Sequence, residues 1–206
     1  VDGIASRFSE TKTVRPSAPP WDGNGTADNP FKITNAEELI AFNKKWKEFQ
    51  NQRLDGQVYF EMTADITLKD YDWEPVGDYS YDPSEPYKDS FKGSFNGNGY
   101  KIKGLTIDRT EKNYVGMFGY VKGTIENIVL EDVYVKGKDY VGGLTGYNGG
   151  QVSNSSITGE KSGIFGRSVV GGLVGSNVGS IASSFAEGNV TGTAHTVGGL
   201  AGSNGA

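Results

Sequence analysis

The residues best suited to chemistry lie in one segment, "KDYDWEPVGDYSYDPSEPYKDSF", which spans residues 69–91. Its three prolines and clustered aspartates indicate a loop. Aromatic rings can stack on the flat faces of pyranose sugars, and carboxylates accept hydrogen bonds from sugar hydroxyls. The same oxygens could coordinate calcium, a cofactor that nothing else in the sequence supports. The segment therefore predicts a loop that binds a sugar or another polar ligand.

Five residues of this loop are the binding candidates, and they are Asp78, Tyr79, Tyr81, Asp82 and Tyr87. An alternative stays open for all of them. The tyrosines could pack on the body of the protein while the acidic side chains only solvate a long exposed loop, because long loops are commonly polar without being binding sites.

The remaining motifs predict no catalytic, metal or cofactor site. The glycine-rich runs lack the lysine that a phosphate-binding loop requires. His195 is the only histidine and there is no cysteine, so neither a zinc site nor a catalytic triad can be assembled. The acidic residues after residue 113 do not recur as the facing pair that a polysaccharide-cleaving site would use. We therefore expect no enzyme activity.

Charge and hydropathy argue against two further classes of partner. The chain of 206 residues carries 20 basic and 25 acidic side chains, a net charge of -5, which disfavours nucleic acid and anionic membranes. No apolar run approaches the roughly 18 residues that a membrane-spanning helix needs, so we expect no membrane insertion.

The elements that must position the loop begin with one helix. Residues 1–20 contain three prolines and no hydrophobic period, and we expect a linker there. Leu39, Phe42, Trp46 and Phe49 then follow helical spacing and predict a helix over residues 35–50, with Thr34 and Glu37 as a capping box. After Gly56, short alternating apolar runs predict strands.

The second half of the chain repeats itself. "YVGMFGYVKG", "YVGGLTGYNGG", "VVGGLVGSNVG" and "TVGGLAGSNGA" start at Tyr114, Tyr140, Val169 and Thr196, which are 26, 29 and 27 residues apart. A period of this length without a helical stripe predicts a parallel β-helix, a solenoid of about 27 residues per coil with two or three short strands in each.

Several details follow from stacked coils. The glycines would lie at corners with positive φ or where backbones pack closely. Asn148, Asn177 and Asn204 occupy equivalent positions and predict one ladder of side-chain amides, and Asn127 with Asn154 predicts a second. The helix is expected to cap the amino-terminal coil, covering its apolar end and unpaired strand groups. The carboxyl-terminal coil has no such cap, so further coils or end-to-end self-association are expected there.

The repeats resemble the GLUG motif of bacterial surface proteins. The resemblance lies in "GGLTG", "GGLVG", "GGLAG" and the variant "VGMFG", preceded by "WEPVG" and "FKGSFNGNGYKIKGLTI". It implies a structural role for Trp73, so the five loop residues named above remain the binding candidates. It also implies a structural role for the repeat residues, which are Gly116, Gly119, Gly143, Leu144, Gly146, Gly172, Leu173, Gly175, Gly199, Leu200 and Gly202.

The resemblance further implies an all-β fold, a right-handed parallel β-helix, over residues 21–206 of a longer secreted or cell-surface bacterial protein. The expected function is a non-catalytic surface or adhesion module that presents a wall and a loop to a host glycan or an extracellular protein. Two alternatives stay open. One is an accessory or spacer module of an IgA-peptidase-like enzyme, and the other is a polysaccharide-active β-helix.

Overall fold

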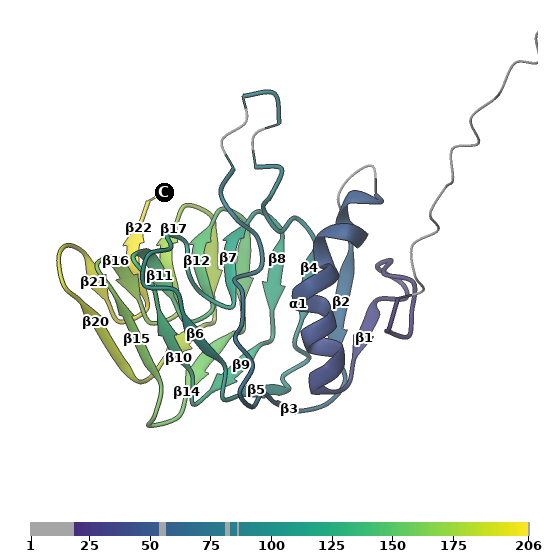
Figure 1. Ribbon diagram of the computed structural model, residues 1–206, viewed down its shortest axis with the longest axis horizontal. Coiled ribbons are helices and arrows are strands. Elements are labelled where there is room, and N and C mark those ends of the chain that lie inside the picture. Colours follow the sequence, from purple (N-terminus) through teal and green to yellow (C-terminus); the bar gives the residue numbers. More distant parts are fainter. Residues whose placement is uncertain (1–18, 54–56, 81–82, 86, 206) are drawn as a thin grey trace, which may run out of the picture.

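The fold is a solenoid of stacked, parallel coils with one helix at its amino-terminal end (Figure 1). The computed structural model describes residues 19–53, 57–80, 83–85 and 87–205. Nearly all of the expected linker, together with Tyr81 and Asp82, lies outside these residues. The predicted fold class, a parallel β-helix with an amino-terminal helix, is confirmed.

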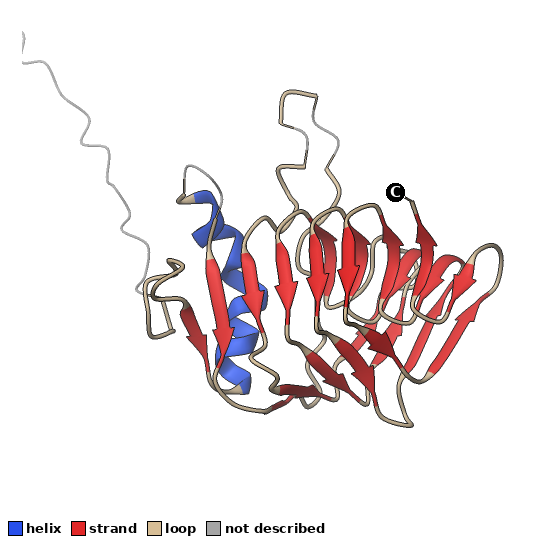
Figure 2. Cartoon of the chain, turned by 180° about the vertical axis from the view of Figure 1, so that it is seen from behind, coloured by secondary structure: helices blue, strands red, loops and turns tan. Residues whose placement is uncertain are grey.

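The strands form five parallel sheets, one along each wall of the solenoid, and helix α1 spans Ala36–Asn51. The longest sheet, seen from behind in Figure 2, contains β1 (Phe31–Ile33), β2 (Tyr59–Met62), β4 (Ser94–Asn96), β8 (Thr124–Glu126), β13 (Gln151–Ser153) and β18 (Ser180–Ala182). The next wall contains β3 (Ile66–Thr67), β5 (Lys101–Lys103), β9 (Val129–Glu131), β14 (Ser156–Thr158) and β19 (Phe185–Ala186).

The other three walls are shorter. One contains β6 (Thr106–Asp108), β10 (Tyr134–Lys136), β15 (Gly163–Gly166) and β20 (Asn189–Gly192). The second contains β11 (Asp139–Gly142), β16 (Ser168–Gly171) and β21 (Val197–Gly198), and the third contains β7 (Phe118–Val121), β12 (Thr145–Asn148), β17 (Val174–Asn177) and β22 (Ala201–Asn204). A full coil such as residues 145–171 thus holds five strands, and the expectation of two or three is wrong.

Strict register between coils builds the core. In the longest sheet, Phe60 aligns with Phe95, Phe95 with Ile125, and Ile125 with Val152. All four side chains are buried, so each column of equivalent positions forms a continuous apolar stack inside the solenoid. Because each strand has only two to four residues, the stacking of coils contributes more to the stability of the fold than any single strand could.

Two columns of equivalent positions have left-handed backbone at residues other than glycine. Tyr114, Tyr140, Val169 and Thr196 occupy equivalent positions with φ of 59°, 59°, 56° and 52°. A second column of such residues contains Asn98, Asn127, Asn154 and Ser183. Only asparagine accommodates this conformation readily, and for β-branched Val169 it is strained.

The repeat glycines other than Gly199 serve close packing instead of corner geometry. None of them has a positive φ, but a Cβ atom at Gly146 would lie 2.5 Å from the carbonyl carbon of Tyr114. At Gly175 it would lie 2.5 Å from the carbonyl oxygen of Gly146. Of the two roles expected for these glycines, close backbone contact is the one observed.

One of the two predicted asparagine ladders forms. Nδ2 of Asn148 donates to Oδ1 of Asn177 at 2.7 Å, and Nδ2 of Asn177 donates to Oδ1 of Asn204 at 2.6 Å. The prediction of a second ladder is wrong, because no hydrogen bond joins the side chains of Asn127 and Asn154 in the described part of the chain. Asn127 instead donates to Asn96 at 3.0 Å.

The N-cap of the helix lies one residue later than the capping box predicted. Asn35, not Thr34, is the N-cap, and its side chain accepts from the amide of Glu38 at 3.0 Å. The Glu38 carboxylate in turn accepts from the amide of Thr34 at 2.7 Å. The Thr34 hydroxyl is held by that of Thr63, which explains why it does not cap the helix.

Helix α1 caps the solenoid with both apolar and polar contacts. Its apolar stripe is buried against the longest sheet. Its two buried amides bind backbone groups of the adjoining coil: Asn43 donates to the carbonyl of Glu74, and Gln50 bonds to the carbonyl of Ser90 and the amide of Lys92. The helix therefore covers apolar side chains of the first coils, as predicted, but the backbone groups that it satisfies lie between strands and not on a strand edge.

The carboxyl-terminal coil is open in this structure. Leu200 is 36% exposed, whereas its equivalents Leu144 and Leu173 are buried, and Phe185 and Val197 are about half exposed. Self-association through this surface stays a prediction.

Acid is expected to destabilise the solenoid through Glu131. This carboxylate binds Lys101 at 2.7 Å and Lys103 at 2.6 Å, and the two hydrogen bonds lower its pKa to about 2 from 4.5. Because the pKa is depressed in the folded state, the stabilisation is present above pH 4.5 and is lost as the pH falls toward 2. Urea unfolding at several pH values should therefore show Glu131→Gln to be less stable than the parent protein at pH 6 and nearly equal to it at pH 2. Glu160→Gln, at an exposed turn, is the control. A difference independent of pH would contradict this role for Glu131.

A tyrosine patch as candidate binding site

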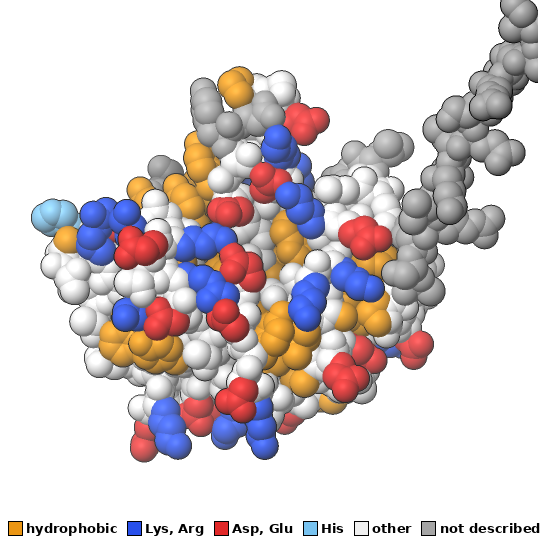
Figure 3. All heavy atoms as spheres, viewed as in Figure 1, with side chains coloured by type: hydrophobic (Ala, Val, Ile, Leu, Met, Phe, Trp, Pro, Cys, Tyr) orange, Lys and Arg blue, Asp and Glu red, His pale blue; other side chains and the backbone are white. Residues whose placement is uncertain are grey.

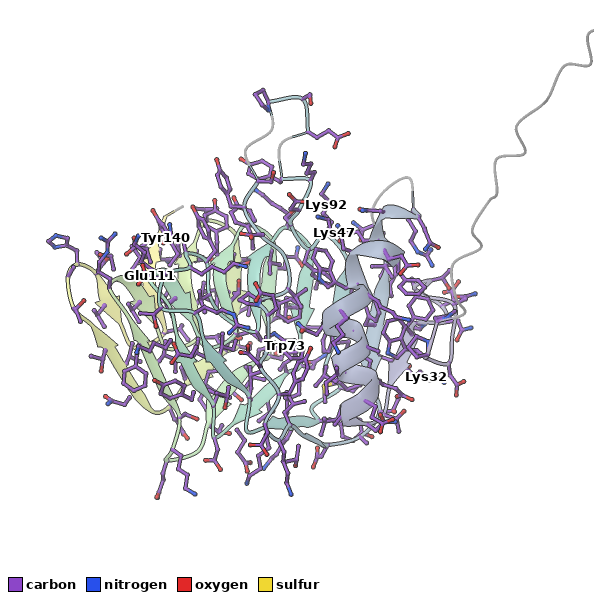
Figure 4. All side chains as sticks on the ribbon, viewed as in Figure 1. Lys32, Lys47, Trp73, Lys92, Glu111 and Tyr140 are labelled. Carbon is purple, nitrogen blue, oxygen red and sulfur yellow. The ribbon has the colours of Figure 1, made fainter. Side chains whose placement is uncertain are left out.

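The predicted binding loop is shorter than residues 69–91. Its first part belongs to a coil, because Asp72 pairs with Thr106 and Val76 pairs with Phe118 in parallel bridges. Trp73, between them, is fully buried inside the solenoid (Figure 4) and donates from Nε1 to the carbonyl of Met117 at 2.9 Å. The part that projects from the body in Figure 1 follows the bridge at Val76, and its described residues are 78–80, 83–85 and 87–90.

The base of the projecting loop is fastened to the helix cap. The amide of Asp78 donates to the carbonyl of Asp89 at 2.8 Å, which closes the loop. Lys47 of α1 forms an ion pair with Asp89 and lowers the pKa of that carboxyl (Figure 4). The loop therefore leaves the body of the protein in a defined direction.

Two loop tyrosines contact tyrosines of the coils. The ring of Tyr79 lies 5.7 Å from those of Tyr114 and Tyr120, measured between centroids. The ring of Tyr87 is stacked on Tyr120 at 5.8 Å. These distances are typical of favourable aromatic pairs.

The coil tyrosines stack on one another along the solenoid axis. Tyr114 and Tyr140 are 4.8 Å apart and 11° from parallel, and Tyr120 and Tyr147 are 4.2 Å apart and 12° from parallel. The strand register explains this, because Tyr120 is aligned with Tyr147 across β7 and β12. We call the set of Tyr79, Tyr87, Tyr114, Tyr120, Tyr140 and Tyr147 the tyrosine patch.

The patch combines buried and exposed rings. Tyr120 is only 3% exposed, whereas Tyr79 and Tyr87 are 43% and 38% exposed. Burial, followed by a hydrogen bond with Tyr147, raises the pKa of Tyr120 well above its usual value, and burial also raises the pKa of Tyr114. Both hydroxyls therefore stay protonated at neutral pH and keep their ability to donate hydrogen bonds.

Charged groups surround the patch. The ammonium group of Lys122 lies 4.4 Å from the centre of the Tyr87 ring, a cation–π contact. Lys112 is 3.5 Å from the Asp78 carboxylate and also pairs with Glu74. Partial burial acts to raise the pKa of Glu74, but hydrogen bonds from Lys112 and Arg109 outweigh it and lower the pKa. These pairs hold the charges beside the patch in place.

The structure brings together three of the five sequence candidates. Asp78, Tyr79 and Tyr87 lie at one end of the loop, against the coil tyrosines, while Tyr81 and Asp82 lie outside the described residues. Tyr79 and Tyr87 pack on the body of the protein and remain partly exposed, and their role in binding stays a prediction.

Four members of the patch were missed by sequence reasoning, which assigned the repeats to structure alone. The available signal was their coil spacing: Tyr114 and Tyr140 start two repeats, and Tyr120 and Tyr147 follow them at equivalent positions. Later coils carry Val169 and Ser176 at those positions, so the tyrosines are confined to the coils beside the loop.

Other chemistry finds little support in the described part of the chain. No group of three or more histidine, cysteine or acidic side chains there is arranged to hold a metal ion. Calcium binding by the loop is therefore not supported by a ligand cluster. Helix α1 is neither long nor apolar enough to cross a bilayer.

Comparisons with known proteins give relatives of much greater length than this chain. No protein-family model matches the chain, so the GLUG resemblance stays a prediction. A protein of Evansella cellulosilytica named "Putative Gly-rich membrane protein" is 36% identical over 146 residues, 66% of this chain. Halomucin of Haloquadratum walsbyi is 28% identical over 149 residues, 69% of this chain. The chain spans 15% and 2% of the lengths of these two relatives.

One solved structure shares the fold. It is described as that of "a putative immunoglobulin A1 protease" from Bacteroides ovatus, and it matches 89% of this chain with a TM-score of 0.65 and 25% identity. The match covers 64% of the Bacteroides chain. The chain is therefore similar in fold to part of that protein and similar in sequence to short stretches of two long relatives.

Proposed function

We propose that this chain is a non-catalytic, extracellular module of a larger bacterial surface protein, and that its tyrosine patch binds a glycan or an extracellular protein. The observation that carries the proposal is the convergence of six tyrosine rings, two from the projecting loop and four from two adjacent coils. The names of the two long relatives, a membrane protein and a halomucin, support placement at the cell surface.

The patch has the properties of a recognition surface. Packing alone does not require tyrosine there, because the next coil carries Val169 and Ser176 at the same positions. Tyrosine presents a large rigid face and a hydroxyl at low entropic cost, which is why it is enriched where proteins bind other molecules. Stacked neighbours hold these rings in fixed orientations, so little ordering remains for a ligand to impose.

The test compares the loop tyrosines with a tyrosine outside the patch. The parent protein, Tyr79→Ala/Tyr87→Ala and Tyr100→Ala would be applied to an array of neutral and acidic glycans and to immobilised extracellular-matrix proteins. Tyr100 is 37% exposed and is the matched control. Loss of two stacking rings is expected to weaken binding about tenfold or more. Binding by the double variant equal to that of the parent would contradict the proposal.

A second candidate function is an accessory module of a secreted peptidase, favoured by the fold shared with the Bacteroides protein. In that case the isolated chain would bind none of the probes, and deleting it from the full-length protein would change which substrates are cleaved. A polysaccharide-active enzyme is the least supported function, and release of new reducing ends from a polysaccharide panel would reveal it.

A further inference from the structure

A second aromatic surface lies on the wall formed by β6, β10, β15 and β20, and it shares no residue with the tyrosine patch. It is an open groove of about 550 Å³ between this wall and the turn at residues 110–111. In Figure 3 apolar side chains gather over β10 and β15, below a group of charged side chains. The volume falls within the range of small-ligand sites, about 300–1,000 Å³.

The floor of the groove is made by two rings. Tyr134 and Phe165 project from neighbouring strands, with centroids 5.4 Å apart and planes tilted by 38°. Tyr134 is aligned with Gly163, and a Cβ atom on Gly163 would lie 2.7 Å from the Phe165 ring. Because Gly163 has no side chain, the Phe165 ring can lie flat over β15, beside Tyr134. Tyr134 is 38% exposed and Phe165 is partly buried, so the two rings together present an apolar face to the groove.

The rim of the groove carries unpaired charges of both signs. Lys136 follows Tyr134 by two residues on the outer face of β10, and Lys138 and Glu111 line the same groove. In the part of the chain that the structure describes, none of these three forms an ion pair, whereas Lys112 beside the tyrosine patch pairs with both Glu74 and Asp78. Arg167, also at the rim, is already neutralised by two hydrogen bonds to Asp139.

We propose that this groove binds an acidic pyranose, a hexuronic acid residue of a glycan. The flat face of the sugar would stack on Tyr134 and Phe165. Its carboxylate would pair with the ammonium groups of Lys136 and Lys138, and Glu111 would accept hydrogen bonds from ring hydroxyls.

Charge complementarity is what selects this occupant. Lys136 and Lys138 form no ion pair in the described residues, although the charge of Lys138 acts on the Asp139 carboxylate. In a chain of net charge -5, these two lysines attract a single anionic group without making the protein a general polyanion binder. A purely apolar ligand would leave the ammonium groups and the Glu111 carboxylate desolvated and unpaired, at a cost in affinity. A sugar with one carboxylate and several hydroxyls satisfies both kinds of group.

The experiment uses two glycosides that differ only at C6, methyl β-D-glucuronide with a carboxylate and methyl β-D-glucoside with a hydroxymethyl group. Each is titrated into the ¹⁵N-labelled chain while backbone amide shifts are followed. We expect shifts at β10 and β15 and an affinity for the glucuronide about tenfold higher, as one charge-assisted hydrogen bond would give. No shift, equal affinities, or shifts confined to the tyrosine patch would overturn the proposal.

Three variants separate charge from stacking. Lys136→Gln/Lys138→Gln keeps both rings and should remove the preference for the glucuronide, while Tyr134→Ala should weaken both ligands. Lys161→Gln, an exposed lysine outside the groove, should change neither affinity. If the double lysine variant kept the parent's preference, the lysines would not be the carboxylate site and the proposal would fall. Thermal unfolding of each variant shows that the fold is retained.

Discussion

Replacing Phe42 by alanine is expected to lower the free energy of unfolding by about 3–5 kcal/mol, the range found for large core aromatics. Phe42 is fully buried on the inner side of the helix cap. Its ring lies 4.8 Å from Phe60 and 4.9 Å from Phe95, and within 6.2 Å of Phe91 and Phe118. The cavity would open where helix, sheet and first coils meet, and these elements cannot all move inward to fill it. Urea unfolding followed by circular dichroism measures the effect.

Glu48→Ala is the matched control for Phe42→Ala. Glu48 is on the same helix, exposed, and alanine is the better helix former, so a change within about 0.5 kcal/mol is expected. If both variants unfolded at the same urea concentration as the parent, the helix would not hold the solenoid end as the contacts indicate. A second check is the spectrum: loss of the helix cap should expose Trp46, whose fluorescence would shift to longer wavelength.

The second large effect is expected from Gly146→Ala. The new Cβ would lie 2.5 Å from the carbonyl carbon of Tyr114 and 2.6 Å from the amide nitrogen of Val115, both backbone atoms of the preceding coil. Backbone cannot rotate away as a side chain would, so two stacked coils must separate or shift. We expect a loss of about 3 kcal/mol, the upper part of the range for overpacked cores.

Gly199→Ala supplies the control from within the same repeat. A Cβ at Gly199 would meet no atom within 4 Å, and its φ is not positive. Alanine there should leave stability unchanged or raise it by up to about 1 kcal/mol, since it reduces the freedom of the unfolded chain. Equal losses for Gly146→Ala and Gly199→Ala would show that the glycines matter for chain flexibility and not for coil contact.

Structural features that depend only on the regular spacing of residue types could be predicted from the sequence. The solenoid, the capping helix and the ladder through Asn177 each follow from residues recurring at fixed spacing, because stacking places equivalent residues side by side. The number of strands per coil could not be predicted. Left-handed backbone occurs at several residues other than glycine, and nothing in the sequence marks Val169, which has this conformation inside β16.

The candidate site was only half predictable for a related reason. Tyr79 and Tyr87 are conspicuous in a loop, whereas Tyr114 and Tyr120 look like ordinary members of the repeats. Their proximity depends on where the loop leaves the solenoid, and that is set by the bridge of Val76 to Phe118 and the closure of Asp78 on Asp89. Likewise, the groove floor depends on Phe165 lying over Gly163, a rotamer that spacing does not reveal.

The asparagine ladder gives the solenoid a direction. Each amide donates toward the following coil, from Asn148 to Asn177 and from Asn177 to Asn204. At its start the Asn148 oxygen is occupied by the amide of Gly150, and the coil before carries Val121 there. The row of amides is therefore polar, because every link takes its donor from one coil and its acceptor from the following coil.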